Sequence, residues 1–108
     1  MGMLEPPHGF HHDCFELSEL ASERLGDPDG LSAMLVAAVG AVGMLALGPP
    51  VVRQGPRGLA IGMLCRDGHI VLHATPGEGT CFIDIAARAP ANVDKGVEVI
   101  LRRLGVPR

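Results

Sequence analysis

The residues best suited to chemistry in this chain lie between positions 65 and 86, where histidines, carboxylates and a cysteine stand among apolar residues. His69 and His73 are four residues apart, and Cys81 and Asp84 follow after a turn that contains glycine. An imidazole changes its charge near neutral pH, so His73 in particular is suited to general acid–base catalysis. The alternative is that these histidines are half-buried sheet residues whose hydrogen bonds are satisfied.

The chain's five histidines also raise the hypothesis of a metal site: His8, His11, His12, His69 and His73. His69 and His73 share one face of a predicted strand, but four residues along a strand span about 13 Å, which is too far for one ion unless the strand bends. His11 and His12 point to opposite faces of their strand. A site that combines His11 or His12 with His73 is left open. A structural zinc site is disfavoured because the chain has no Cys-x-x-Cys pair.

The cysteine and the carboxylates of this segment each allow two interpretations. Cys81 follows a glycine turn, and a nucleophilic Cys–His pair would need its thiol within hydrogen-bond reach of a histidine. A buried cysteine that acts as a small hydrophobic residue is the alternative. Glu78 lies between two glycines on a flexible turn, where its carboxylate is either solvated or used in binding. Asp84 alternates with Ile83 and Ile85, which predicts a carboxylate that faces solvent or accepts a hydrogen bond from a turn.

The composition restricts the partners and the compartment. The net charge is −3 and only 3% of the residues are aromatic, so the chain lacks the basic stripe and the stacking platforms that bind nucleic acid. Its three cysteines are widely spaced and odd in number, which indicates a reduced, cytoplasmic protein. The first residues lack the regions of a signal peptide. The apolar run over residues 31–47 is at the short limit for crossing a bilayer, so we expect a buried helix and no membrane partner.

The pattern predicts one domain over residues 1–108, in which residues 1–9 form a loose leader. The predicted strands cover residues 10–17, 42–47, 59–65, 68–74 and 80–86, and residues 51–54 are expected to be extended. The predicted helices cover a short turn at 18–25, then 31–42 and 93–104. Ser18, Asp29 and Asn92 are the predicted helix caps, and residues 27–30 form a predicted turn. Strands 68–74 and 80–86 should pair antiparallel. This order predicts an α+β two-layer sandwich, with helices on one face of an antiparallel sheet.

Two histidines, a proline, a glycine and an aspartate keep a recognisable spacing in Asp67-Gly68-His69-Ile70-Val71-Leu72-His73-Ala74-Thr75-Pro76-Gly77, with Gly79 and Ile83-Asp84-Ile85 in step. This spacing resembles the core motif of the prokaryotic S-adenosylmethionine decarboxylases, which are small, pyruvoyl-dependent enzymes of polyamine biosynthesis. Their motif runs Glu-Ser-His, three apolar or small residues, His-Thr-Trp-Pro-Glu, a turn with glycine and a strand with aspartate. The resemblance covers roughly residues 9–105. It implies an S-adenosylmethionine decarboxylase-like fold and a homodimer, because in the family the sheets of two chains or two halves assemble around the active sites.

The departures from this motif affect the implied activity. In the family, the serine hydroxyl attacks the preceding carbonyl, the backbone is cleaved and the serine becomes the pyruvoyl group. Gly68 stands at that position and has no hydroxyl, and Arg88 stands where the family has its catalytic cysteine. The motif's glutamate matches Gly77, with Glu78 one residue later, and threonines replace its aromatic residues. The resemblance therefore implies an uncleaved chain with no pyruvoyl cofactor.

Three hypotheses follow for the function. In the first, the chain is a divergent enzyme that binds S-adenosylmethionine or a related cationic metabolite and acts on it by lyase-type chemistry. Its candidate catalytic residues are His73, His69 and Glu78, and its candidate substrate-binding residues are Asp67, Gly68, Thr75 and Cys81. In the second, the chain is a non-catalytic regulatory or ligand-binding relative that pairs with an active decarboxylase. In the third, it is a metal-binding module that uses its histidines.

Overall fold

A computed structural model describes residues 2–107 of the chain. The elements, in chain order, are β1 (Phe10–Leu17), α1 (Ser22–Leu25), α2 (Pro28–Val42), β2 (Val51–Gln54), β3 (Leu59–Cys65), β4 (Gly68–Thr75), a 3-10 turn η1 (Pro76–Glu78), β5 (Thr80–Arg88) and α3 (Asp94–Arg103). The five strands form one sheet in the order β1-β5-β4-β3-β2, and every neighbouring pair is antiparallel. The predicted pairing of β4 with β5 is confirmed.

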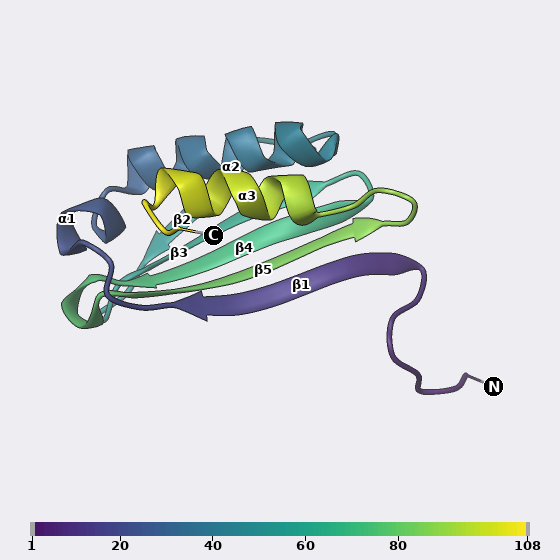
Figure 1. The fold of residues 1–108 in the computed structure, drawn as a ribbon, viewed down its shortest axis with the longest axis horizontal. Coiled ribbons are helices and arrows are strands. Elements are labelled where there is room, and N and C mark those ends of the chain that lie inside the picture. The colour runs from purple at the N-terminus through teal and green to yellow at the C-terminus, as the bar shows by residue number, and fades with distance from the viewer. Residues whose placement is uncertain (1, 108) are drawn as a thin grey trace.

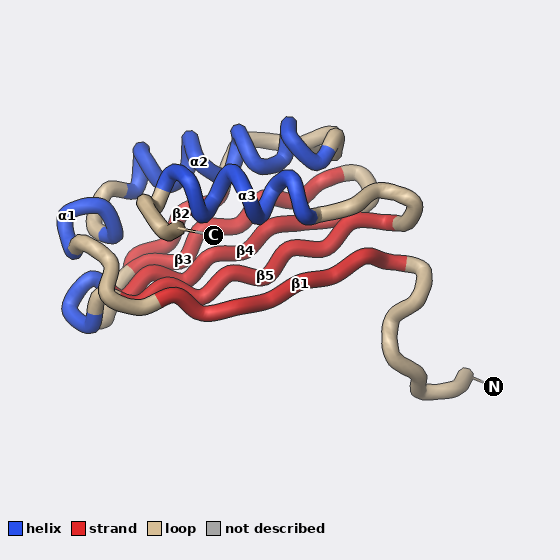
Figure 2. The backbone as a smooth tube through the Cα atoms, in the orientation of Figure 1, coloured by secondary structure: helices blue, strands red, loops and turns tan. Residues whose placement is uncertain are grey.

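The helices α2 and α3 lie side by side across one face of the sheet (Figure 1). Figure 2 shows the same two layers, with the helices in blue above the strands in red. No helix or strand of residues 2–107 covers the other face, which we call the open face. The predicted α+β two-layer sandwich is confirmed.

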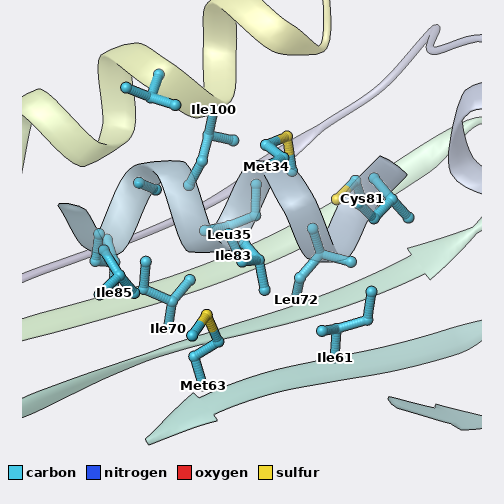
Figure 3. Packing of buried hydrophobic residues seen from close by; sticks show 14 of the residues in the cluster. Met34, Leu35, Ile61, Met63, Ile70, Leu72, Cys81, Ile83, Ile85 and Ile100 are labelled. Atoms are coloured by element: carbon cyan, nitrogen blue, oxygen red, sulfur yellow. The ribbon is translucent and has the colours of Figure 1, made fainter. Parts of the chain in front are cut away.

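The hydrophobic core fills the space between the helices and the sheet. Alternate residues of β3, β4 and β5 point into this space, so that Ile61, Ile70, Leu72, Ile83 and Ile85 are fully buried. They pack against the inner side chains of α2 and α3 (Figure 3). Since the sequence has no Trp or Tyr and only three Phe, the core consists of aliphatic and sulfur-containing side chains.

The start of α2 differs from the prediction. The helix begins at Pro28, and the Asp27 side chain accepts a hydrogen bond from the backbone N–H of Gly30 at 3.1 Å. Asp27 rather than Asp29 is therefore the N-cap, and the turn predicted over residues 27–30 is wrong. Proline suits the first helical position because the N–H that it lacks would have no partner there. The cap predicted at Ser18 is also wrong, since α1 starts only at Ser22.

The strand predicted over residues 42–47 does not form. Gly43 has a φ of 87° and ends α2 in the left-handed conformation, which turns the chain out of the helix. Only Ala46 then forms an isolated bridge, to Cys65. The apolar run over 31–47 is thus divided between α2 and a loop, and no helix in residues 2–107 is long and apolar enough to cross a membrane. At α3, the N-cap is Val93 and not the predicted Asn92, although the Asn92 side chain does accept a hydrogen bond from the backbone N–H of Asp94 at 2.8 Å.

Gly96 allows α3 to pack closely against α2 and β5. A Cβ added there would lie 2.7 Å from Val42 Cγ2 and 2.9 Å from Ile85 Cδ1, whereas a Cβ at Gly40 would meet nothing within 4 Å. We expect Gly96→Ala to lower the free energy of unfolding by about 1 kcal/mol through overpacking. Gly40→Ala should raise it by roughly 0.5–1 kcal/mol, because alanine favours a helix over glycine. Urea denaturation of both variants tests this, and equal shifts would contradict the packing seen at Gly96.

Candidate functional site

The open face displays the polar side chains of β4 and β5. Along β4, Ile70 and Leu72 point into the core, so that His69 and His73 both face the opposite way, as their spacing predicts. The two histidines lie toward opposite ends of the strand. His69 is near the β3–β4 turn and His73 is near the β4–β5 turn, which are on the right and on the left of Figure 1. The predicted site residues therefore fall into two separate groups.

Three side chains from three neighbouring strands meet on the open face. The Asp84 Oδ1 atom of β5 accepts hydrogen bonds from His12 Nε2 of β1 at 3.1 Å and from His69 Nε2 of β4 at 3.2 Å. The register of the sheet explains this contact. His12 of β1 and His69 of β4 both pair with Ala86 of β5, one from each side, and Asp84 is the neighbouring residue of β5 on the same face. The three side chains are between 32% and 41% exposed, so a ligand can reach them. We call them the open-face cluster.

The hydrogen bonds of the open-face cluster define what its imidazoles can do. A carboxylate can only accept hydrogen bonds, so each Nε2 carries the hydrogen. In a neutral imidazole the Nδ1 atom is then the unprotonated, basic nitrogen. A carboxylate that holds one imidazole nitrogen fixes both the tautomer and the direction of the ring. The cluster therefore presents two oriented nitrogen bases beside one carboxylate, which is an arrangement suited to proton transfer.

An ion pair lies beside this cluster, at the same end of the sheet. Arg88 Nε donates a hydrogen bond to Asp67 Oδ1 at 3.2 Å. The Arg88 guanidinium also stacks over the Phe10 ring, with its Cζ atom 4.6 Å from the ring centroid. A cavity of about 550 Å³ is bordered by Asp67, Arg88, Met44 and Pro90. Its volume is in the range of pockets that hold small organic ligands. Asp67 thus lies where a ligand in this cavity would meet its carboxylate.

Gly68, at the first position of β4, has no room for a side chain. A Cβ there would lie 2.2 Å from the carbonyl oxygen of Ala86 and 2.7 Å from Met44 Sδ. The position matched to the family's serine therefore lacks both the hydroxyl from which a pyruvoyl group is made and the space for it. The residues present do not fit that group.

The second group of predicted residues lies at the other end of β4. His73 and Thr75 border a different cavity, of about 450 Å³, together with Arg53 and Arg57. The His73 ring centroid is 6.4 Å from that of Phe82. Glu78 is exposed on the 3-10 turn η1. Within one chain these residues do not reach the open-face cluster.

Cys81 points away from all of the histidines on the open face. Its side chain lies in the core and is 1% exposed, and burial raises the pKa of its thiol to about 12. The residue has no hydrogen bond to a histidine, so residues 2–107 contain no Cys81–His pair. Burial also raises the pKa of the Cys65 thiol.

Thiol reactivity tests this placement. Cys14 is exposed, whereas Cys65 and Cys81 are buried, so a thiol reagent at neutral pH should modify one cysteine rapidly and the other two only after denaturation. A buried thiol favours the neutral form, so the contribution of Cys81 to stability should be constant below pH 9. It should be lost progressively from pH 9 toward pH 12, because there an unfolded Cys81 ionises and the folded one does not. Rapid modification of all three thiols in the native protein would contradict the fold.

The histidines do not converge on a metal site. His11 points to the helix side, where its Nδ1 accepts a hydrogen bond from the backbone of Val93 at 2.9 Å. His8 pairs with Glu5 in the leader at 2.6 Å. Over the part of the chain that the structure describes, no group of three or more His, Cys, Asp or Glu residues is placed to hold a metal ion. The site suggested for His11 or His12 with His73 does not form, because His12 bonds Asp84 at the other end of the sheet.

Two members of the open-face cluster were not identified from the sequence as site residues. Asp84 was expected to face solvent or a turn, and His12 appeared only as an alternative metal ligand. The alternation of residues predicts that Asp84 and His69 face the same side, which was the available signal. The pairing of β1 with β5, which brings in His12 from 72 residues away, leaves no local mark in the sequence.

The comparisons with known proteins agree with this fold. Residues 11–108 match the sequence profile of the S-adenosylmethionine decarboxylase family. The structure is similar to the crystal structure of the adenosylmethionine decarboxylase from Aquifex aeolicus VF5, with a TM-score of 0.78 and 17% sequence identity. The match covers 92% of this chain and 82% of that one. No curated protein sequence matches the chain. The chain belongs to the S-adenosylmethionine decarboxylase family.

Proposed function

We propose that this protein binds S-adenosylmethionine or a related cationic metabolite at the open-face cluster and acts on it by lyase-type chemistry, without a pyruvoyl group. The observation that carries the proposal is the pair of imidazoles oriented by Asp84 on an uncovered sheet face. With neutral imidazoles, the cluster has the single negative charge of its carboxylate. That charge attracts a sulfonium or an ammonium group.

The chemistry needs little beyond a positioned base. A sulfonium sulfur is already an activated leaving group, so removal of a proton from a carbon beside the C–S bond expels a neutral thioether as the new double bond forms. The proton passes to Nδ1 of His69, whose Nε2–H is held by Asp84. A positioned general base contributes typically 100- to 10,000-fold in rate. Asp67, beside the adjacent cavity, is the second candidate partner for the cation, which would have to replace Arg88 in its ion pair.

The proposal includes a homodimer formed through the open face. Four large apolar side chains on that face are exposed to solvent: Phe10, Val51, Leu64 and Phe82. An antiparallel sheet can leave one face to solvent when its side chains are polar, but exposed apolar groups of this size favour a partner. A second copy would cover them and enclose the cluster. The three free thiols support a reducing, cytoplasmic location.

A second candidate function is a non-catalytic regulatory subunit that binds the same ligand. It is favoured by the loss of space at Gly68 and by the Arg88–Asp67 ion pair, which occupies the position matched to the family's catalytic cysteine. Ligand binding without turnover would support it.

Product analysis separates the two candidates. The purified protein is incubated with S-adenosylmethionine, and the products are identified by mass spectrometry. Asp84→Asn removes the orienting charge and should lower the rate of product formation about 100-fold. Glu16→Gln makes the same change of charge on the same face of the sheet, at a β1 residue that pairs with Phe82 and has no hydrogen bond to the cluster, and should leave the rate unchanged. If no product forms with the wild-type protein, the catalytic proposal fails.

A further inference from the structure

The two edge strands of the sheet, β1 and β2, differ in length and composition (Figure 1). β2 is only four residues long and follows Pro49 and Pro50, which cannot donate hydrogen bonds to another strand. β1 is eight residues long and pairs with β5 without a bulge. It also contains no proline and no lysine, which are residues that commonly protect a strand edge from other chains. The β1 edge is therefore open to pairing with a further strand.

The hydrogen bonds between β1 and β5 determine which backbone groups of β1 point outward. The N–H of Ala89 donates to the carbonyl of Gly9 at 2.9 Å, directly beside the pair of Phe10 with Arg88. Hydrogen-bonded pairs alternate along an antiparallel ladder, so every second residue of β1 from His11 onward bonds to β5. The residues between them direct both their N–H and their C=O away from the sheet, and no group in residues 2–107 bonds to these atoms. These residues are Phe10, His12, Cys14 and Glu16.

A second copy of β1 fits this edge best in one register. Two identical antiparallel strands in one sheet are related by a two-fold axis, which passes between two copies of the same residue. An axis at Cys14 lets residues 11–17 of both copies overlap, and an axis at Asp13 gives an overlap of the same length. The axis at Asp13 would place two carboxylates directly opposite each other, which is destabilising. Every other axis leaves a shorter overlap, so charge and length together select Cys14.

The register centred on Cys14 also pairs complementary side chains. His12 of each copy lies opposite Glu16 of the other, on both sides of the axis. A carboxylate beside an imidazole stabilises the protonated ring, so this is a favourable cross-strand pair. The backbone contributes as well, because each hydrogen-bonded pair of residues exchanges two N–H···O bonds. The unpaired edge of β1 thus complements itself in both its backbone and its side chains.

We propose that two copies of this chain join through their β1 edges, with Cys14 on the two-fold axis, so that their sheets form one continuous sheet. The contact is made by backbone groups in the plane of the sheet, so it leaves the open face free for the homodimer proposed above. Where both contacts form, four chains assemble. A single strand pair buries little surface, so the edge contact should be weak and form at higher protein concentration than the open-face homodimer. The inference does not depend on the proposed S-adenosylmethionine chemistry.

Crosslinking at Cys14 tests the position of the axis. Two Cys14 residues opposite each other have Cα atoms about 5.5 Å apart, which a short bismaleimide can bridge. Cys14 is exposed, whereas Cys65 and Cys81 are buried, so the reagent should join two chains through Cys14 alone. The experiment uses the Gly62→Glu variant, in which an added carboxylate disrupts association through the open face. At high micromolar protein concentration, most chains should become covalent dimers, and peptide mass spectrometry identifies the joined residues.

A cysteine at position 16 is the matched control for the crosslinking. It is introduced as Glu16→Cys together with Cys14→Ser and Gly62→Glu, and it is exposed on the same strand face. In the proposed register, two thiols at this position lie four residues apart along the strands, or about 13 Å, so they should crosslink at least about tenfold more slowly.

Proline at position 16 tests the role of the outward N–H. Because the N–H of Glu16 points away from β5, Glu16→Pro should keep the ladder with β5 and remove one hydrogen bond of the contact from each copy. Glu16→Ala also removes the carboxylate but keeps the N–H. In the Gly62→Glu background, the proline variant should associate at least about tenfold more weakly than the alanine variant. Sedimentation equilibrium measures the association, and circular dichroism verifies that both variants fold.

Three results would overturn the proposal. The first is the absence of a Cys14 crosslink in Gly62→Glu at high micromolar concentration. The second is equally fast crosslinking at positions 14 and 16, which would indicate random collisions. The third is equal association of the proline and alanine variants when both are folded, which would show that the contact does not use the β1 edge. Each of these results leaves the proposed binding of S-adenosylmethionine unaffected.

Discussion

Gly68→Ser is expected to leave the chain uncleaved and to lower its free energy of unfolding by about 3 kcal/mol. The substitution restores the residue type that the family uses for self-processing, but the Cβ would lie 2.2 Å from the carbonyl oxygen of Ala86 and 3.0 Å from the Cα of Ala87. Both are backbone atoms of the adjacent strand, so β4 and β5 must separate to admit the side chain. Intact-mass spectrometry measures cleavage, and urea denaturation measures stability.

Gly62→Ser is the matched control for this experiment. Gly62 is also a strand glycine, but a Cβ at this position meets no atom within 4 Å. Serine there should change the free energy of unfolding by less than about 0.5 kcal/mol, when it is measured at a protein concentration low enough that the variants are monomeric. Two chain fragments from Gly68→Ser would contradict the account, because they would show that the fold still positions a serine for the acyl shift. Equal stability of the two variants would contradict the tight packing at Gly68.

Gly62→Glu is expected to dissociate the proposed homodimer while the subunit stays folded. Gly62 lies at the centre of the open face, between Val51 of β2 and Val71 of β4. The carboxylate is solvated in a monomer, but it would be buried without a partner in a sheet-to-sheet interface. An uncompensated charge in an interface costs several kcal/mol, so the association constant should fall at least about 100-fold. Sedimentation velocity over a range of protein concentrations measures the change.

Val36→Glu is the control for the dimer prediction. Val36 is 50% exposed on α2, on the helical layer of the molecule, so its substitution introduces the same charge away from the open face. The variant should remain dimeric. A wild-type protein that sediments as a monomer at every concentration would contradict the homodimer. So would a Gly62→Glu variant that stays as dimeric as Val36→Glu.

Much of the fold could be predicted from the sequence because its signals are local. Alternating apolar residues identify β3, β4 and β5, and the stripe that includes Leu31, Leu35 and Ala38 identifies the buried side of α2. The errors occurred where two local signals compete. Asp27 and Asp29 are both candidate caps, and Pro28 between them decides in favour of Asp27, because proline suits the first helical position better than a turn here. After Gly43, the apolar residues suggested a strand, but they pair with β3 only at Ala46.

The candidate site was harder to predict because its parts come together only in three dimensions. A period of two places His69, His73 and Asp84 on one face, but it does not say which strands are neighbours. The register of β1 on β5 brings His12 to Asp84, and the length of β4 keeps His73 away. Gly68 has no room for a side chain because the carbonyl oxygen of Ala86, on the neighbouring strand β5, lies next to it. The sequence indicated which residue types were available for chemistry, whereas the sheet determined which of them meet.

Binding of S-adenosylmethionine at the open-face cluster is best measured by calorimetric titration of the purified protein, on a sample whose intact mass has been determined. We expect an uncleaved chain that binds the ligand. We also expect that Asp84→Asn loses most of the affinity for the cation, while Glu16→Gln keeps it. No heat of binding with the intact wild-type protein would contradict the account. A mass that reveals two fragments would contradict it as well, because the protein would then process itself as its pyruvoyl-dependent relatives do.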